Sequence, residues 1–332
     1  MKKFSYLLVF LFLFALIGCN DDVANDDGRL RVVTTVSPIT NIVFNIGGEH
    51  IHLDGIVPEG VNSHTFEPAP SDAITLAQAD LIFLNGLNLE LPSLELAQAN
   101  LKDGGEIILL GELTIDPEDY VYDFSFPREA GNPNPHLWTN PFYAQEYARI
   151  AMEALVARDP DNAADYEANY AAFSSKIEQL DEAIRATTAS IPAENRKLLT
   201  YHDSFAYFAP LYGYTVIGAI QPADFSEPSA QEVARLIEQL RNEEIPAIFG
   251  SEVFPSPILD QIGREAGAAY VDTLRDDDLP GDPGDENHSY IGLMVYDLQI
   301  MAEALGGDPA LMADVDTANI PGIDSDVNQA QE

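Results

Sequence analysis

The sequence predicts an α/β protein with two lobes, each with a mainly parallel sheet and flanking helices, joined by one long rigid linking helix. Three observations lead to this fold class. Short apolar segments alternate with amphipathic segments from Leu30 onward, which is typical of parallel strands covered by helices. The alternation stops once, over residues 160–190, where no strand signal occurs. It then resumes, so two α/β units flank one helical segment.

Eight strands are expected, four on each side of this break. Each is a short apolar run bounded by polar or turn-forming residues, and helical patterns lie between most of them. The expected strands are Leu30–Val36, Ile51–Val57, Asp80–Asn85, Glu106–Leu110, Lys197–Tyr201, Tyr214–Ile220, Ile245–Gly250 and Ala269–Leu274. The expected helices include Pro70–Ala79, Pro141–Ala157, Ser229–Asn242 and Ser289–Leu305.

The break itself carries one continuous helical stripe. Asp159 is a suitable N-cap and Pro160 a suitable first helical residue. About 30 residues at roughly 1.5 Å each form a rod of about 45 Å, which is longer than a crossover helix needs to be. The stripe recurs at intervals of three and four residues and consists of Tyr166, Tyr170, Phe173, Ile177, Leu180 and Ile184.

The N-terminus is typical of a lipoprotein signal peptide over residues 1–18. Two lysines precede the apolar segment Tyr6–Ile17, which is short for a membrane span, and the single cysteine, Cys19, follows a small residue as in a bacterial lipobox. We expect lipidation of Cys19; an ordinary signal peptide or a short anchor helix is the alternative. The remaining boundaries are an acidic tether at 19–28, lobes at 29–160 and 191–306, a linking helix at 161–190, and a mobile acidic tail at 307–332.

Charge and cysteine content exclude several classes of protein. The 332 residues contain 16 Lys+Arg against 55 Asp+Glu, a formal net charge of −39 at pH 7. Such a chain repels nucleic acid at every phosphate, and it does not dock on anionic lipid through basic patches. A single cysteine also excludes an intramolecular disulfide and a cysteine-based zinc site.

Four of the six histidines share a sequence context. His64, His136, His202 and His288 each lie where a strand–helix unit places a loop or a helix start. Ligands of open α/β sheets collect beyond the carboxyl ends of strands, and two of these histidines come from each lobe. We therefore expect them to meet in the interlobe cleft, where four neutral imidazoles can close a tetrahedral zinc shell. For each one, a histidine hydrogen-bonded to backbone is the alternative interpretation.

The other two histidines, His50 and His52, form a His-x-His pair on an expected strand. Both rings would share one face of that strand, an arrangement that can chelate a metal. An edge strand with outward polar residues explains the pair more simply.

Several short stretches together resemble a known family over residues 30–305. They are Val33-Thr-Thr-Val-Ser-Pro38, His64-Thr-Phe-Glu-Pro68 with Ser71-Asp72, Asn85-Gly-Leu-Asn-Leu-Glu90, Pro135-His-Leu-Trp138 and Glu227-Pro-Ser229. This combination is similar to the TroA-like metal-binding lipoproteins of bacterial ABC importers for zinc, manganese and iron. The resemblance implies one metal ion per chain between two lobes, a permease and an ATPase as partners, no enzymatic activity, and a lipid-anchored monomer on the outer face of the cytoplasmic membrane.

The resemblance also implies a ligand set. The first three family ligands match His64, His136 and His202, and the fourth, usually Asp or Glu in the family, appears here as His288. That departure leaves other fourth ligands open, because the alignment crosses an acidic loop. The possible alternative ligands are Glu252, Asp285, Glu286 and Asp297.

The expected ion is zinc, with manganese or iron as alternatives. A nitrogen-rich set favours Zn²⁺, whereas carboxylates favour Mn²⁺. The segment Gly111–Pro135 lacks the histidine-rich loop of many zinc members and carries six acidic residues instead. A metallohydrolase or a metal-stabilised adhesin is the alternative of another class, although the sequence has no His-Glu-x-x-His, no Gly-x-Ser-x-Gly and no phosphate loop.

Overall fold

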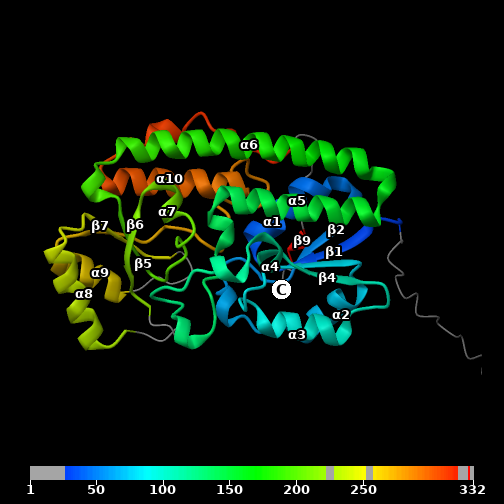
Figure 1. The fold of residues 1–332 in the computed structure, drawn as a ribbon, viewed down its shortest axis with the longest axis horizontal. Coiled ribbons are helices and arrows are strands. Elements are labelled where there is room, and N and C mark those ends of the chain that lie inside the picture. Colours follow the sequence, from blue (N-terminus) through cyan, green and yellow to red (C-terminus); the bar gives the residue numbers. More distant parts are fainter. Residues whose placement is uncertain (1–26, 222–227, 252–256, 321–327, 330–332) are drawn as a thin grey trace, which may run out of the picture.

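The computed structural model describes residues 27–221, 228–251, 257–320 and 328–329. The predicted signal peptide, Cys19 and most of the predicted tether lie outside these ranges, and so does Glu252. Within them the two-lobe α/β fold class is confirmed (Figure 1). No helix in the described ranges is long and apolar enough to cross a membrane.

The first sheet has five parallel strands in the order β4-β3-β1-β2-β9. Its first four strands alternate with helices along the chain, as expected, and β9 comes from the C-terminal segment. Helices α1 and α5 lie on one side of this sheet and α2 and α3 on the other (Figure 1). The bounds are β1 Leu30–Thr34, α1 Ser37–Gly47, β2 Ile51–Gly55, α2 Pro70–Gln78, β3 Leu81–Leu84, α3 Leu91–Asn100, β4 Glu106–Leu109, α4 Leu110–Thr114, α5 Pro141–Arg158 and β9 Asn328–Gln329.

The second sheet has four parallel strands in the order β6-β5-β7-β8. Helices α8 and α9 close its outer side, and α10 lies on the side that faces α6 (Figure 1). The bounds are β5 Lys197–Thr200, α7 Ala209–Tyr212, β6 Thr215–Ala219, α8 Ala230–Asn242, β7 Ala247–Phe249, α9 Pro257–Ala266, β8 Ala269–Val271 and α10 Tyr290–Leu305.

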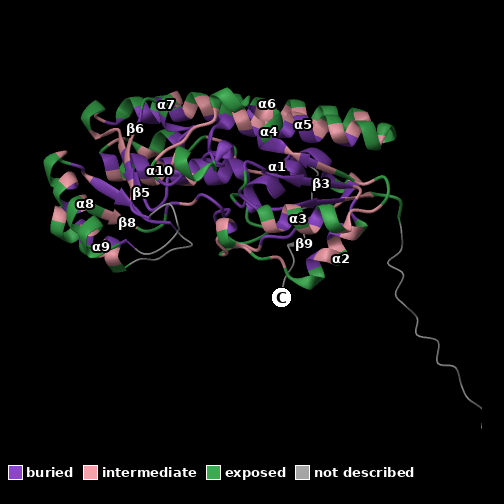
Figure 2. Ribbon diagram, turned by 60° about the horizontal axis from the view of Figure 1, so that its bottom comes forward, coloured by how far each residue is buried: buried purple, intermediate pink, exposed green. Residues whose placement is uncertain are grey.

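Helix α6, Ala163–Ser190, runs along both lobes and packs on α5 and α10 (Figure 1). The predicted stripe is its buried face, apart from the half-buried Tyr170, and the burial colours of Figure 2 show the opposite face exposed. The helix begins later than expected, because Pro160–Asn162 forms a separate 3₁₀ turn. The Asp159 carboxylate does not cap the first turn; it accepts hydrogen bonds from Tyr166 Oη (2.8 Å) and from Asn162 Nδ2 (2.6 Å).

The segment after α10 differs from the expected mobile tail. Met312 and Ile320 are buried in the core, and Asp316 pairs with Lys176 of α6 at 2.5 Å. Asn319 Oδ1 accepts hydrogen bonds from Asn41 (3.1 Å) and from a second α1 amide. Met312 and Ile320 are well separated in the sequence and form no periodic pattern. Hydrophobic periodicity therefore cannot predict that they are buried in the core.

Replacing Phe173 by Ala tests whether α6 is part of the common core. Phe173 is 1% exposed, and its ring centroid lies 6.1 Å from that of Tyr290 in α10. We expect Phe173→Ala to lower the free energy of unfolding by about 3–5 kcal/mol, because it leaves a cavity. Denaturant unfolding followed by circular dichroism measures this loss. Glu178→Ala, at an exposed position of the same helix, is the control, with an expected change within about 0.5 kcal/mol. Equal losses of stability in the two variants would contradict the packing of Phe173 in the common core.

Candidate metal-binding site

Three of the predicted histidines come from different loops at the junction of the lobes. His64 lies in the 3₁₀ turn Ser63–Thr65 after β2, and Asn62 Oδ1 accepts a hydrogen bond from its backbone N–H (2.9 Å). His136 directly precedes the 3₁₀ turn Leu137–Thr139 that leads into α5. His202 follows the carboxyl end of β5 by two residues. Two of the three loops therefore belong to the first lobe and one to the second.

The three imidazoles converge on one point. His136 Nε2 lies 3.1 Å from His64 Nε2 and 3.1 Å from His202 Nε2, and the potential ligand atoms of all three residues lie within 4.8 Å of one another. His136 and His202 are 0% and 2% exposed. Among the described residues, these three histidines form a group whose ligand atoms lie close enough together to hold one metal ion.

A carboxylate that the sequence reasoning missed joins this cluster. Asp276 Oδ2 lies 2.9 Å from His202 Nε2, and Asp276 is 5% exposed. Asp276 follows the end of β8 by five residues, and the position of ligands beyond the carboxyl ends of strands is a signal that could have identified it. It was overlooked because it begins a run of three aspartates in a loop that otherwise suggests solvation.

His288, the expected fourth ligand, is not brought into the cluster. Its Nε2 lies 3.6 Å from Glu59 Oε1, and its Nδ1 lies 3.3 Å from the carbonyl oxygen of Pro280. The backbone N–H of His288 donates to the carbonyl of Asp285 (3.0 Å), which folds the loop into a turn just before α10 and holds the imidazole there.

The other candidates for a fourth ligand have different partners. Asp285 and Glu286 are exposed, and Asp285 Oδ2 accepts a hydrogen bond from the backbone N–H of Asp282 (3.0 Å). Asp297 is buried in α10 and accepts a hydrogen bond from the backbone N–H of Arg275 (2.9 Å). Glu252 lies outside the described residues.

Burial and charge set the protonation of the three imidazoles. Burial, followed by the charge of His202, lowers the pKa of His64 to about 3, and the same causes hold the pKa of His136 well below its usual range. Burial also acts to lower the pKa of His202, but the Asp276 carboxylate, together with Asp277 and Asp203, outweighs it and raises that pKa above its ordinary value. Conversely, His202 outweighs burial and keeps the pKa of Asp276 low. Two imidazoles are therefore neutral near pH 7, as metal ligation requires.

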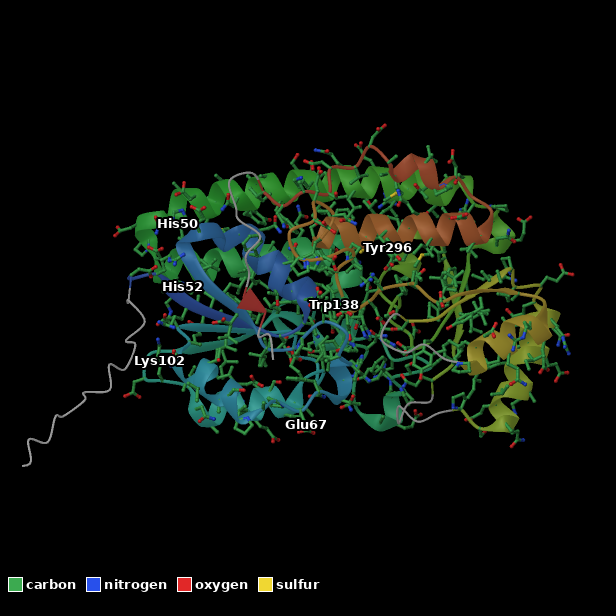
Figure 3. All side chains as sticks on the ribbon, turned by 180° about the vertical axis from the view of Figure 1, so that it is seen from behind. His50, His52, Glu67, Lys102, Trp138 and Tyr296 are labelled. Carbon is green, nitrogen blue, oxygen red and sulfur yellow. The ribbon has the colours of Figure 1, made fainter. Side chains whose placement is uncertain are left out.

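Aromatic side chains pack against two of the clustered imidazoles. The Trp138 ring centroid lies 5.1 Å from that of His136, and the Phe126 ring centroid lies 5.4 Å from that of His64. Trp138 Nε1 also donates a hydrogen bond to the carbonyl of Asp276 (2.8 Å), so an aromatic side chain of the first lobe positions the loop that carries the carboxylate. Figure 3 shows Trp138 near the middle of the molecule, where the two lobes meet.

The loop from Asp276 to Asp278 makes further hydrogen bonds to the first lobe. Ser63 Oγ donates to Asp277 Oδ2 (2.6 Å), and the backbone N–H of Gly60 donates to Asp278 Oδ2 (2.7 Å). The aspartate run is therefore buried between the lobes and attaches one lobe to the other.

A cavity of about 340 Å³ leads to the site from the first lobe. Its lining includes His64, Leu87, Phe126, Asn132 and Pro135. Of the three clustered histidines, only His64 lines it, and only His64 is partly exposed. The cluster is therefore reached from the His64 side.

His50 and His52 lie far from the cluster, at one end of the first lobe (Figure 3). His50 Nε2 lies 2.9 Å from Asp165 Oδ2 of α6, whereas His52 Nε2 lies 2.9 Å from Asp27 Oδ1. The two rings thus have different acidic partners. The expected pair on an edge strand is wrong, because His50 lies in the 3₁₀ turn Gly48–His50 before β2 and β9, not β2, is at the edge of the sheet.

A family model and curated relatives match nearly all of the folded chain. The model described as "ZnuA: Zinc-uptake complex component A periplasmic" matches residues 32–304. The metal ABC transporter substrate-binding lipoprotein FimA of Streptococcus parasanguinis is 29% identical over 308 residues, which is 92% of this chain and 99% of the relative. The manganese ABC transporter substrate-binding lipoprotein PsaA of Streptococcus anginosus is 30% identical over 313 residues with the same coverage.

Solved structures support the same relationship. The periplasmic zinc binding protein TroA from Treponema pallidum superposes with a TM-score of 0.76 at 27% identity, covering 84% of this chain and 99% of TroA. The Mn-bound periplasmic metal binding protein from Candidatus Liberibacter asiaticus superposes with a TM-score of 0.72 at 27% identity, covering 83% of this chain and all of that one. The chain belongs to the ZnuA and TroA family of metal-binding substrate-binding lipoproteins of ABC transporters.

Proposed function

We propose that this protein captures one zinc ion outside the cytoplasm and delivers it to the permease of an ABC importer. The convergence of three imidazole Nε2 atoms on one point, two of them from buried residues, supports metal capture most directly. Family membership supports the delivery step, because the relatives are substrate-binding proteins of metal ABC transporters. The ion is therefore the cargo of the protein.

The proposed ligands are His64, His136, His202 and Asp276. The Asp276 carboxylate replaces His288 in this set because it already contacts His202 at 2.9 Å, whereas His288 faces Glu59. Three nitrogens and one carboxylate oxygen are a four-coordinate set of the kind that binds zinc.

Zinc is preferred over manganese and iron on the chemistry of these ligands. Three imidazoles and one carboxylate are still nitrogen-rich, and a given site binds Zn²⁺ more tightly than Mn²⁺ in the Irving–Williams order. PsaA relatives are named for manganese and TroA for zinc, so both ions occur among similar proteins. The ligand set therefore supports zinc more strongly than the names do.

Four protein ligands favour capture over catalysis. A catalytic zinc site keeps one position open for water or substrate, and the proposed set fills all four. Two carboxylates near the cluster, Asp277 and Asp278, accept hydrogen bonds from Ser63 and Gly60, which attach them to the first lobe. The protein then acts as a receptor that loads and releases cargo.

The location and partners follow from the same proposal. Lipidation of Cys19 would anchor the protein to the outer face of the cytoplasmic membrane, as the lipoprotein names of the relatives suggest. The permease and its ATPase are the proposed partners, and one monomer carries one ion.

Metal analysis of the purified protein tests the proposal. Protein purified without added metal is analysed for its elements, stripped with a chelator, and titrated with Zn²⁺ in the presence and absence of Mn²⁺. We expect one zinc per chain and displacement of Mn²⁺ by Zn²⁺. Retention of Mn²⁺ against equimolar Zn²⁺ would make manganese the cargo, and a stripped protein that binds neither ion would refute the proposed function.

Paired substitutions identify the fourth ligand. We expect Asp276→Asn to weaken zinc binding about 100-fold or more, the equivalent of ~2.7 kcal/mol, because it removes the one anionic ligand. His288→Ala is the control from the same loop and should change affinity less than about threefold, or ~0.65 kcal/mol. Titration calorimetry with a competing chelator measures both. A larger loss of affinity in His288→Ala than in Asp276→Asn would identify His288 as the fourth ligand.

Zinc affinity should fall as the pH is lowered, because one histidine of the site takes up a proton. His202 has a raised pKa, so below that pKa it carries a proton that the metal must displace. His64 and His136, with lowered pKa values, carry none near neutral pH. Zinc affinity should therefore decrease about tenfold per pH unit below the pKa of His202 and level off above it. Calorimetry in buffers of different ionisation enthalpy counts the protons released. Release of three protons would contradict this assignment.

A further inference from the structure

Asn134 is fully buried next to His136, and its amide oxygen makes two contacts to that residue. Asn134 Oδ1 accepts a hydrogen bond from the backbone N–H of His136 (2.9 Å) and lies 2.9 Å from Nδ1 of the ring. An amide oxygen has no proton to donate, so Nδ1 must be the protonated nitrogen of a neutral ring. Nε2 then presents its lone pair to the cluster.

The opposite side of the amide determines which way it points. Asn134 Nδ2 donates to Asp123 Oδ2 (2.7 Å) and to the carbonyl oxygen of Asp203 (2.5 Å). Both partners are acceptors, and a flipped amide would put its oxygen against them and its nitrogen against the backbone N–H of His136. The hydrogen-bond network therefore permits one orientation.

The backbone of Asn134 is held as firmly as its side chain. Its N–H donates to the carbonyl of Val121 (2.9 Å), and its carbonyl accepts a hydrogen bond from Tyr207 Oη (3.1 Å). Tyr207 and Asp203 belong to the segment that follows His202. Asn134 consequently connects one predicted ligand, His136, to the segment that carries another, His202.

The convergence of the three rings agrees with this tautomer. His136 Nε2 lies 3.1 Å from the Nε2 atoms of both His64 and His202. His202 Nε2 also lies 2.9 Å from the Asp276 carboxylate, so that nitrogen carries a proton. A second proton on His136 Nε2 would face it across 3.1 Å, whereas an unprotonated His136 Nε2 avoids that contact.

We propose that Asn134 is a positioning residue that fixes His136 as the Nδ1–H tautomer, with Nε2 free for the metal, and holds His136 in register with His202. Partners that hold the distal nitrogen of a ligating histidine set its tautomer and orientation, and their loss typically costs about 10–100-fold in metal affinity. The role in metal binding rests on the proposed function. The tautomer expected for His136 in the metal-free protein does not depend on the proposed function.

The metal-free wild-type protein provides the first test. The ¹⁵N chemical shifts of labelled imidazoles distinguish a protonated from an unprotonated nitrogen, and the chain has only six histidines. We expect His136 to show a protonated Nδ1 and an unprotonated Nε2, and His136→Gln identifies its signals by their loss. A protonated Nε2 on a neutral His136 would overturn the proposal even if every variant misfolded.

Substitutions of Asn134 provide the second test. Asn134→Leu removes the acceptor, so His136 should populate both tautomers and zinc affinity should fall about 10–100-fold. Asn134→Asp keeps an oxygen facing Nδ1 and should retain the Nδ1–H tautomer, although it loses the hydrogen bonds to Asp123 and Asp203 and should lower the stability of the protein. Asn100→Leu is the matched control, because the Asn100 amide donates a hydrogen bond to the carbonyl of Leu96 (2.8 Å) within α3 and is not part of the cavity that leads to the cluster. We expect it to leave the tautomer and the affinity unchanged.

The outcomes separate this proposal from the proposed function. An unchanged His136 tautomer in Asn134→Leu, or a zinc affinity within twofold of wild type, would refute the positioning role while zinc binding stands. A wild-type protein with the expected tautomer but no affinity for zinc or manganese would refute the proposed function and leave the tautomer assignment intact.

Discussion

The rest of the structure depends on the burial of one ion pair, His202 and Asp276, at the junction of the two lobes. A charged pair removed from water is costly unless further hydrogen bonds satisfy it. Ser251 Oγ donates to Asp276 Oδ1 (3.4 Å) within the second lobe, and the first lobe holds the loop in place, because Trp138 donates to the backbone carbonyl of Asp276 and Ser63 donates to Asp277. The loop that carries the carboxylate is thus the loop that joins the lobes, so the integrity of the site and the contact between the lobes have the same physical basis.

The fold could be predicted largely from periodicity, because strands and helices bury faces at different spacings. The stripe of α6 was identified in this way. Its start was not, because Asp159 is a good N-cap by local chemistry and yet its carboxylate bonds to Tyr166 one turn into the helix. The segment around Met312 and Ile320 was missed for a related reason, since isolated apolar residues find their pockets only in the tertiary structure.

The candidate site could be predicted in part. The sequence places His64, His136 and His202 in loops at strand ends or helix starts, and the topology of parallel sheets gathers such loops. It does not say which side chain of a loop turns inward. His288 and Asp276 lie in one loop, and backbone hydrogen bonds such as that from His288 N–H to Asp285 decide which of them faces the cluster. A run of three aspartates in a chain of net charge −39 also looks like solvation until its burial is known.

Helix α6 has one more consequence, which concerns cooperativity. Its buried face packs against α5 of the first lobe and α10 of the second, and one continuous hydrophobic core holds residues of both lobes, such as Val32 and Phe249. Neither lobe can lose its packing without exposing a side of the same helix. A ligand held between the lobes therefore stabilises the whole chain by mass action. Through this shared helix, loading with cargo is linked to the melting of strands that lie far from the ion.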